Sequence, residues 1–535
     1  MVAIDKRLRY LISILSGFLM VISFPFTGSL TPLMFIAMVP LLLLESYISR
    51  KKYRSGKVFI HAFITFFIYN VGTTWWVWNA SAEGSVMAFI LNSLLMTIVF
   101  QCFHFTKKYV GNKEGYISLL FYWIAFEYFH FNWESSWPWL ALGNTFSITP
   151  SWVQWYEFSG VLGGTFWILI VNLLVFRIYD NVYFKKESWN IQTPLIWIAT
   201  LCFGLPLLFS IYRYYSYTEV ERPFEVIAIQ HNIDPYNDKF NSSVYNQFDK
   251  IVHLADSIVD TGTDLLIAPE TSLSVRIDEN NFHLTSLYNY IKESQAALDN
   301  IPIYIGGFTS RYFNEWNSRA SRPLYNGAGF IEHYNTSIYF NESPIPGYIH
   351  KSKLVPGVEK IPFSNHFPFL EDLSIDLGGG TGTLGVEDKP KIFVDEKLRF
   401  APVICYESIF GEHLAQQCNE GAELICIITN DGWWGDTPGY RQHQSFASLR
   451  AIENRRSLAR AANTGSSCFV NQRGDILQPT KWWVETAIKE KLNLNNKLTF
   501  YSQNGDSLGR VSSFVSVLLI LFSFVKWFRK KFSYK

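Results

Sequence analysis

The sequence predicts a multi-pass α-helical membrane bundle joined to an α/β layered domain, and three observations support this fold class. Charged residues make up only 17% of the 535 residues and apolar residues 49%, whereas an ordinary soluble domain carries about 25% charged residues. The shortage of charge lies in the first ~210 residues and in a short stretch near the C-terminus, the apolar segment 511–528. Residues 213–508 instead alternate strand-like and helix-like patterns. We therefore expect, in order, a domain of seven spans over residues 1–212, a globular domain, and a last span with a basic tail over residues 509–535.

About eight segments are long and apolar enough to cross a bilayer, whose hydrocarbon core requires about 20 residues of helix. The first follows Lys6, Arg7 and Arg9 as a signal peptide would, but no small-residue cleavage site comes after it. Another apolar segment begins a few residues later, so we expect an uncleaved span. The expected spans are residues 10–26, 31–48, 58–77, 85–105, 115–131, 160–177, 193–212 and 511–528.

The lysines and arginines of the short loops predict the orientation of these spans. Nineteen of them lie in the N-terminal segment, near residues 50–57, 107–113 and 177–186, and in the C-terminal tail. The opposite short loops contain none. Because positively charged loops stay in the cytoplasm, both termini are expected to be cytoplasmic and the globular domain extracytoplasmic. The net charge of +1 gives no reason to expect a nucleic acid partner.

The loop of residues 132–159 contains five tryptophans and no lysine or arginine. Tryptophan favours the membrane–water interface because its ring is partly apolar and partly polar. The sequence leaves two interpretations open. The loop is either an aromatic anchor at the interface, or a wall along which lipid reaches a site in the outer domain.

In residues 213–508, short apolar runs indicate strands that are buried on both faces, and their alternation with helices indicates an α/β fold. Polar residues follow several runs: Glu270 after DLLIAP, Cys405 after FAPVI, and Asn430 and Asp431 after LICIIT. Open α/β sheets place their chemistry at such strand ends. The expected strands are 225–232, 264–269, 303–307, 327–333, 400–405, 423–429 and 467–471, and the expected helices are 243–259, 284–299, 407–417 and 440–462.

Three residues of this domain have the chemistry of a catalytic site. Cys405 lies where a strand gives way to a helix, and a helix N-terminus favours the thiolate of a group whose ordinary pKa is near ~8.5. A carboxylate such as Glu270 acts as a general base when burial raises its pKa, and an ammonium such as Lys351 stabilises an oxyanion. Taken singly, each residue also fits a non-catalytic role. Cys405 could be an inert buried cysteine, Glu270 an exposed carboxylate in a turn, and Lys351 a solvated surface lysine.

The cysteines indicate neither a zinc site nor a disulfide framework. Their spacing matches no CxxC pattern, and Cys102 and Cys202 lie in apolar segments where they are expected to pack. A disulfide between Cys418 and Cys426 is one option that the sequence leaves open.

In combination, the order Glu270, Lys351, Cys405 resembles the nitrilase, or carbon–nitrogen hydrolase, superfamily, and the whole chain more closely resembles the apolipoprotein N-acyltransferases. The resemblance covers essentially the full length and implies a nitrilase-like α-β-β-α layered sandwich for residues 213–508. The matching motifs are IAPETS at 267–272, YN at 325–326, K-x-x-LVP at 351–356, CYES at 405–408, NDGWWGD at 430–436, QH at 442–443, RAIENRRSLARAANTG at 450–465 and TFYSQNGD at 499–506.

The resemblance implies a role for each matching residue. Cys405 would be the nucleophile, Glu270 the general base and Lys351 the oxyanion stabiliser, with no metal among the catalytic groups. Phe240 falls near a position where the family often has tryptophan. The supporting or substrate-binding residues would be Glu359, Tyr406, Glu407, Asn326 and Trp433.

One segment departs from the family's usual pattern, Y-x-K-x-H-L-V-P-F-G-E. Here the tyrosine, Tyr348, comes one residue early, Lys353 takes the histidine position, and Gly-Val replaces Phe-Gly. Lys351 and Glu359 keep their spacing. The shape of the loop after Lys351 is therefore where this chain is expected to differ.

The resemblance implies a two-step, ping-pong acyl transfer at the bacterial inner membrane that needs no cofactor. A membrane phospholipid would acylate Cys405 as a thioester. The N-terminal diacylglyceryl-cysteine of an apolipoprotein would then accept the acyl chain on its α-amine, completing lipoprotein maturation. Phospholipids, apolipoproteins and the bilayer would thus be the partners. Two alternatives remain open at this point: a membrane-tethered amidase of the nitrilase type, and a non-catalytic membrane receptor with a nitrilase fold.

Overall fold

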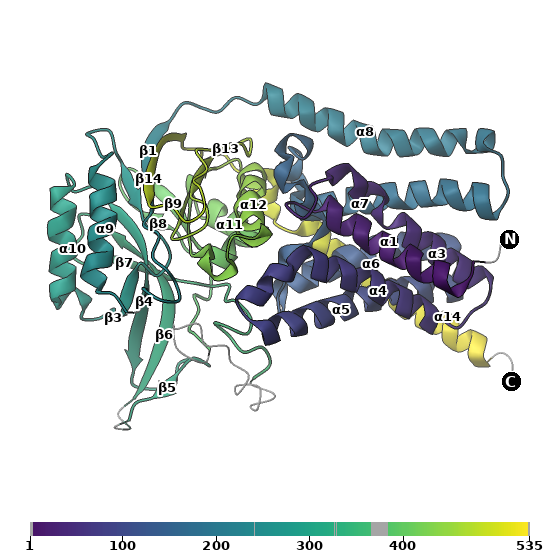
Figure 1. Cartoon of the computed structure of the whole chain (residues 1–535), viewed down its shortest axis with the longest axis horizontal. Coiled ribbons are helices and arrows are strands. Elements are labelled where there is room, and N and C mark those ends of the chain that lie inside the picture. Colours follow the sequence, from purple (N-terminus) through teal and green to yellow (C-terminus); the bar gives the residue numbers. More distant parts are fainter. Residues whose placement is uncertain (1–3, 240, 326, 328, 365–382, 533–535) are drawn as a thin grey trace. The chain divides into compact units, whose positions relative to one another are not determined.

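The computed structural model describes residues 4–239, 241–325, 327, 329–364 and 383–532 of the chain (Figure 1). The chain divides into two compact units. The first unit comprises Met1–Ser216 together with Asp506–Lys535, and the second comprises Tyr217–Gly505. The divisions thus fall after Ser216 and after Gly505, a few residues from the expected 212 and 508.

The first unit is helical. Its long helices pack in neighbouring pairs, such as α1 with α4, α5 with α6, and α6 with α14. The last helix, α14, comes from the far end of the chain, so the two terminal segments share one unit. The helices are α1 Lys6–Ser23, α2 Met34–Ala37, α3 Val39–Arg50, α4 Gly56–Thr74, α5 Ala82–Tyr109, α6 Asn112–Asn132, α7 Tyr156–Tyr179, α8 Thr193–Ser216 and α14 Ser507–Phe532.

Within the described residues, six helical segments are long and apolar enough to cross a membrane. They are Thr31–Arg50, Gly56–Asn79, Ala82–Tyr109, Tyr156–Phe184, Trp189–Ser216 and Ser507–Phe532. The segments expected at 10–26 and 115–131 also form helices, α1 and α6, but their charged and polar side chains lower their mean hydropathy. The count of eight spans therefore stays a prediction.

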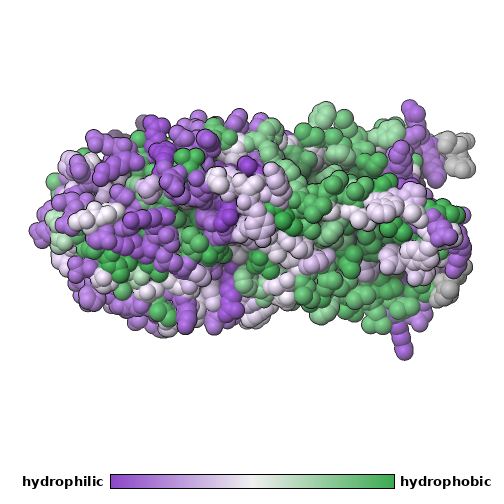
Figure 2. Space-filling view, turned by 90° about the horizontal axis from the view of Figure 1, so that it is seen from above, coloured by the Kyte–Doolittle hydropathy of each residue, from purple (hydrophilic) through white to green (hydrophobic). Residues whose placement is uncertain are grey.

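The surface of the helical unit is that of a membrane protein. Trp197 and Leu205 of α8 and Phe514 and Leu521 of α14 are more than half exposed. Hydrophobic residues dominate the visible surface of this unit, whereas hydrophilic residues dominate that of the other (Figure 2). Exposed apolar surface on this scale is unfavourable in water and favourable against lipid.

Part of the tryptophan-rich loop packs inside the helical unit. Glu127 of α6 accepts hydrogen bonds from the backbone N–H of Leu142 at 2.9 Å and from the Thr165 hydroxyl at 2.6 Å, which ties the loop to two helices. Trp139 is buried, with its ring centroid 4.7 Å from that of Trp76. These contacts anchor the loop from within, and both interpretations of its outer side stay predictions.

The second unit contains two sheets. Over the described residues, the first has eight strands, in the order β14-β1-β2-β4-β6-β5 with β3 beside β4 and β7 beside β6, and the second has six, in the order β13-β12-β11-β10-β9-β8. The first sheet contains β1 Pro223–Gln230, β2 Leu265–Ile267, β3 Leu273–Asp278, β4 Ile303–Phe313, β5 Arg322–Pro323, β6 Phe330–Phe340, β7 Gly347–His350 and β14 Thr486–Asn493. The second contains β8 Phe393–Val394, β9 Arg399–Ile404, β10 Leu424–Thr429, β11 Ser457–Ala462, β12 Cys468–Val470 and β13 Ile476–Leu477.

Among the described residues, three hydrophobic cores stack these sheets and their helices into the expected α-β-β-α sandwich. Along β1, Val226 and Ala228 face the second sheet, while Ile227 and Ile229 face the helices α9 and α10. This alternation explains why the strand reads as a continuous apolar run. The helices of this unit are α9 Val244–Asp256, α10 Ser286–Ala297, α11 Gly411–Asn419, α12 Pro438–Asn454 and α13 Phe500–Asn504, with α11 and α12 packing on the second sheet.

The expected helix 440–462 is wrong in its last third. Helix α12 ends at Asn454, Arg455 adopts a left-handed conformation with φ 49°, and Ser457–Ala462 forms the central strand β11. The segment is rich in alanine, arginine and leucine, which favour helix. Parallel pairing with β10 on one side and antiparallel pairing with β12 on the other override that preference.

The suggested disulfide is also wrong, because Cys418 and Cys426 are both free. Cys426 of β10 faces the core between the two sheets, whereas Cys418 of α11 packs in the core on the other face of the second sheet. The sheet itself therefore separates the two sulfurs.

Candidate active site

Four strand ends from the two sheets meet at one place, and the three predicted catalytic residues gather there. Glu270 follows β2 and Lys351 follows β7 of the first sheet, while Cys405 follows β9 and Asn430 follows β10 of the second. Lys351 contacts Glu270 directly, and the charges of both act on the Cys405 thiol. All three side chains thus come from residues that directly follow strands or lie within three residues of a strand end.

The Glu270 carboxylate is buried and held by three donors. One oxygen accepts from Lys351 Nζ at 3.3 Å and from Asn335 Nδ2 at 2.8 Å, and the other accepts from the backbone N–H of Asn430 at 3.1 Å. The turn at Glu270 also requires a glycine on the neighbouring strand. A Cβ at Gly306 would lie 2.6 Å from the Glu270 Cα, which is closer than such atoms approach.

Lys351 is 1% exposed and lies between two carboxylates. Its Nζ donates to Glu359 Oε1 at 2.9 Å and to Glu270 at 3.3 Å. Burial alone would lower the pKa of Lys351, but the Glu359 and Glu270 carboxylates raise it well above its usual value. The ammonium therefore stays charged at any physiological pH, as an oxyanion stabiliser requires. Despite the departures in the surrounding motif, Lys351 and Glu359 contact each other.

Asn335 of β6 completes this network, and sequence reasoning missed it. Its Nδ2 donates to Glu270 at 2.8 Å and to Glu359 at 2.9 Å, and its backbone O accepts from the N–H of Lys351. The residue thus fixes the carboxylates and the lysine relative to one another. Asn335 is one of several polar residues in the strand FIEHYNTSIYF, so nothing in the sequence distinguished it from the others.

Cys405 adopts a left-handed backbone conformation, φ 51°, at the turn after β9. Such a conformation is costly for a residue with a Cβ and marks positions that the surrounding structure holds in place. Burial, and secondarily the Glu270 carboxylate, raise the pKa of the Cys405 thiol, while Lys351 opposes them. Together, these influences favour the protonated form of the thiol.

The expected helix 407–417 is present, but it begins four residues later than expected. The chain forms a 3₁₀ turn, Cys405–Ile409, and the α-helix α11 begins only at Gly411. A dipole from one short turn is much weaker than that of a helix. The charges that act on the thiol are those of Glu270, Lys351 and Asp431.

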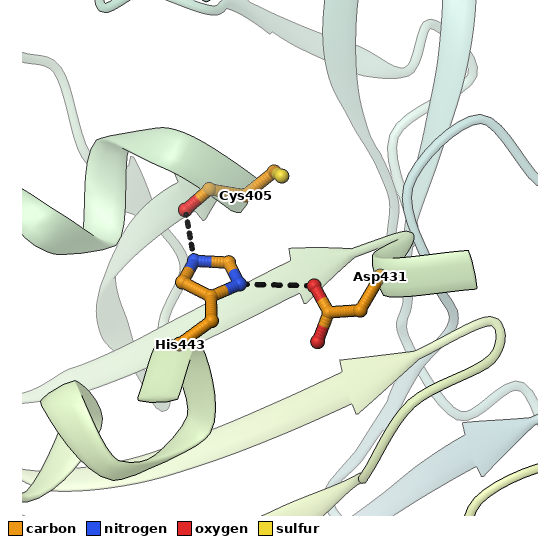
Figure 3. Close-up of side chains that lie close together, drawn as sticks. All are labelled: Cys405, Asp431 and His443. Atoms are coloured by element: carbon orange, nitrogen blue, oxygen red, sulfur yellow. Dashed lines mark hydrogen bonds and ion pairs between the residues drawn. The ribbon is translucent and has the colours of Figure 1, made fainter. Parts of the chain in front are cut away.

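A buried chain of side chains supports the backbone of Cys405 rather than its sulfur (Figure 3). His443 Nε2 lies 3.2 Å from the Cys405 carbonyl O, and its Nδ1 lies 2.9 Å from Asp431 Oδ1. Arg460 donates to the other Asp431 oxygen at 2.5 Å, and the Ser408 hydroxyl donates to the Cys405 carbonyl at 2.7 Å. Burial would raise the pKa of Asp431, but Arg460 and His443 hold it below its usual value. Asp431, His443 and Arg460 all lie within the matching motifs, but nothing in the sequence assigned an individual role to any of them.

Among the described residues, Cys405, Asp431 and His443 are the types that bind metals, and their ligand atoms lie within 4.8 Å of one another. Both imidazole nitrogens and both Asp431 oxygens already have protein partners. The Arg460 guanidinium also places a positive charge beside Asp431. These residues therefore do not fit a metal site, and the polar contacts explain the cluster without one.

Glu407 joins the Cys405 turn to the loop after β7. It accepts backbone hydrogen bonds from Ile404 at 2.8 Å, Ser352 at 2.6 Å and Lys353 at 3.2 Å. Burial raises its pKa to about 7. Tyr406 is buried, and its ring lies 5.2 Å from that of Phe410. Glu407 thus holds the backbone around Cys405 and Lys351, while Tyr406 packs its ring against Phe410.

Trp433 stands at the loop after β10 and contacts the loop after β1. Its ring centroid lies 5.1 Å from that of Tyr236, whose hydroxyl donates to the Trp433 carbonyl. Lys239 Nζ lies 5.9 Å from the Trp433 ring centroid, and this buried lysine was not predicted. Asn326 and Phe240 lie outside the described residues.

The carbon-nitrogen hydrolase family profile matches residues 226–496, which is half of the chain and contains the whole candidate site. The chain belongs to the carbon-nitrogen hydrolase family. The profile of the apolipoprotein N-acyltransferase N-terminal domain matches residues 16–174 in the helical unit. The two matches together confirm the resemblance inferred from the motifs.

Several apolipoprotein N-acyltransferases are similar to this protein over nearly the whole chain. The apolipoprotein N-acyltransferase of Chlorobaculum tepidum is 28% identical over 97% of both chains. That of Geobacter metallireducens is 26% identical over 94% of this chain and 93% of its own. That of Haemophilus influenzae is 24% identical over 98% of this chain and 97% of its own. These alignments therefore cover both the helical unit and the carbon-nitrogen hydrolase domain of this chain.

Proposed function

We propose that this protein is an apolipoprotein N-acyltransferase. It moves a fatty acyl chain from a membrane phospholipid, through a thioester on Cys405, to the α-amine of a diacylglyceryl-cysteine. One observation carries the proposal. Glu270, Lys351 and Cys405 lie together at the ends of neighbouring strands, and the other unit of the same chain contains helices long enough to cross a membrane. The relatives' names support the choice of substrates.

In the first half-reaction, Glu270 takes the thiol proton as the Cys405 sulfur attacks the ester carbonyl carbon. The raised pKa of the thiol requires these two events to be coupled, because little free thiolate exists beforehand. A C–S bond forms, and the carbonyl oxygen becomes an oxyanion that Lys351 stabilises. The ester C–O bond then breaks, and the leaving alcohol takes the proton from Glu270. The products are the thioester and a lysophospholipid.

In the second half-reaction, the neutral α-amine attacks the thioester carbonyl. Lys351 again stabilises the oxyanion, and Glu270 takes the proton that the nitrogen loses. The C–S bond breaks, the sulfur takes the proton from Glu270, and an amide leaves. Each half-reaction returns Glu270 to its carboxylate form, so the enzyme follows ping-pong kinetics with side chains as the only catalytic groups.

The supporting residues act on the backbone around these three groups. Glu359 and Glu407 hold the loop that carries Lys351, and Tyr406 packs beside the Cys405 turn. Trp433 and Asn326 are proposed as substrate-side residues. The domain 213–508 is proposed to face the periplasm, between seven spans in 1–212 and a last span in 509–535. Both termini would then face the cytoplasm at the inner membrane.

The direct test is mass spectrometry of the purified full-length protein after incubation with phospholipid vesicles and no acceptor. We expect Cys405 to gain the mass of one fatty acyl group, with release of an equal amount of lysophospholipid. A diacylglyceryl peptide should then remove that mass. Cys405→Ala should gain none, whereas Cys202→Ala, which changes a thiol of the helical unit, should behave as the wild type.

The outcomes also separate the two alternatives. Acylation by soluble amides but not by phospholipid would identify a membrane-tethered amidase. No acylation by either substrate, with a Cys405 that does not react with thiol reagents, would identify a non-catalytic receptor. Both results would contradict the proposed transfer.

A further inference from the structure

A second lysine reaches the turn that carries Glu270. Lys239 lies in the loop after β1, is 5% exposed, and donates from its Nζ to the hydroxyl of Thr271. Thr271 follows Glu270 directly and adopts a left-handed conformation with φ 52°. The Lys239 carbonyl accepts from the buried Gln247 side chain of α9 at 2.8 Å, which fixes this loop to the helix. The contacts with Thr271 and Gln247 thus hold the Lys239 ammonium beside the Glu270 turn.

The charges around Lys239 come from three strand ends. Glu270 after β2 and Cys405 after β9 both act on its ammonium, and Lys239 in turn acts on the buried His231 after β1. Lys351 already serves two carboxylates, Glu270 and Glu359. The Lys351 ammonium therefore faces the two negative charges of Glu270 and Glu359. A buried charge without an opposite charge beside it costs free energy.

We propose that Lys239 is a further positioning residue of the same reaction. Its ammonium holds the Glu270–Thr271 turn and offsets the negative charge as that charge moves from the Glu270 carboxylate to the Cys405 sulfur. The inference rests on the proposed role of Cys405 as nucleophile. Because Lys239 acts on both groups, it stabilises the site before and after the proton moves.

The protonation of Lys239 gives the proposal a distinct signature. Burial lowers the pKa of Lys239 to about 8, against the pull of Glu270 and Cys405. The ammonium is therefore present below that pH, and its support is lost as the pH rises through about 8. An arginine at the same place would stay charged throughout.

The test is the rate at which iodoacetamide alkylates Cys405 in the full-length protein in detergent, measured from pH 6 to pH 10. In Lys239→Met we expect a rate about tenfold lower at pH 7, since a change of one unit in the thiol pKa changes the thiolate fraction tenfold. The difference from the wild type should disappear above pH 8, where Lys239 itself is neutral. Lys239→Arg should restore the rate and keep it above the wild type beyond pH 8. The matched control Lys292→Met, a half-buried lysine of α10 bonded to Gln295, should leave the profile unchanged.

Three results would overturn the inference. One is a Lys239→Met profile identical to the wild type. Another is a rate lowered by the same factor at every pH, above pH 8 as well as below, since a purely structural role would give that result. The third is a wild-type chain labelled no faster than Cys405→Ala, which would refute the nucleophile and this inference together. A rate loss in Lys239→Met that disappears above pH 8, in a chain that phospholipid does not acylate, would support the inference and contradict only the proposed function.

Discussion

Glu407 offers a sharp test of how the site is held together. Its Oε2 accepts from the backbone N–H of Ile404 at 2.8 Å, and its Oε1 accepts from those of Ser352 at 2.6 Å and Lys353 at 3.2 Å. Glu407→Gln keeps the size of the side chain but turns one acceptor oxygen into a donor amide. Whichever way the amide is placed, its NH₂ group faces a backbone N–H. We therefore expect slower acylation of Cys405.

The magnitude follows from the bond that is lost. A hydrogen bond to a charged group contributes ~1.5–3 kcal/mol, and each ~1.4 kcal/mol is a factor of ten in rate. Because the lost hydrogen bond holds the loop that carries Lys351, acylation should slow by about 10- to 100-fold. Burial raises the pKa of Glu407 to about 7, and protonation removes an acceptor in the same way. Wild-type acylation should therefore fall as the pH drops through about 7, and the Gln variant should lack this dependence.

The assay is the rate of thioester formation after rapid mixing with excess phospholipid, at pH values from about 5.5 to about 8.5, one unit or more on either side of that pKa. Glu420→Gln, at an exposed glutamate that follows α11, is the control and should match the wild type in rate and pH dependence. A Glu407→Gln rate within twofold of the wild type at pH 8 would refute the reasoning. A pH dependence near 7 that persists in the variant would do the same.

The remaining predictions concern the catalytic groups and the orientation. Glu270→Gln should slow thioester formation by ~10²–10⁴ and recover partly as the pH rises, because hydroxide then removes the thiol proton; burst kinetics without such recovery would contradict a base. Lys351→Met should slow acylation and deacylation alike by ~10²–10³; an effect on one half-reaction alone would argue against oxyanion stabilisation. A reporter fused at Asn317, in an exposed loop, should be active only in its periplasmic form, and cytoplasmic activity would reverse the proposed orientation.

Composition and short motifs were enough to predict the two kinds of domain and the residues most worth testing. The apolar segments identify membrane helices because the bilayer sets their length. Continuous apolar runs identify the buried strands. Glu270 and Cys405 follow two of these runs, and the resemblance of the combined motifs to a known family singled them out. These signals lie within a few consecutive residues, so they can be read without knowing what lies beside them in space.

Tertiary structure decided everything that depends on residues far apart in the chain. Ser457–Ala462 became a strand only because β10 and β12 pair with it. Asn335 and Lys239 joined the site only because β6 and the loop after β1 carry them to Glu270. A side chain's own neighbours in sequence cannot report such contacts. The sequence on its own therefore determined which chemical groups this protein has, and folding determined which of those groups meet.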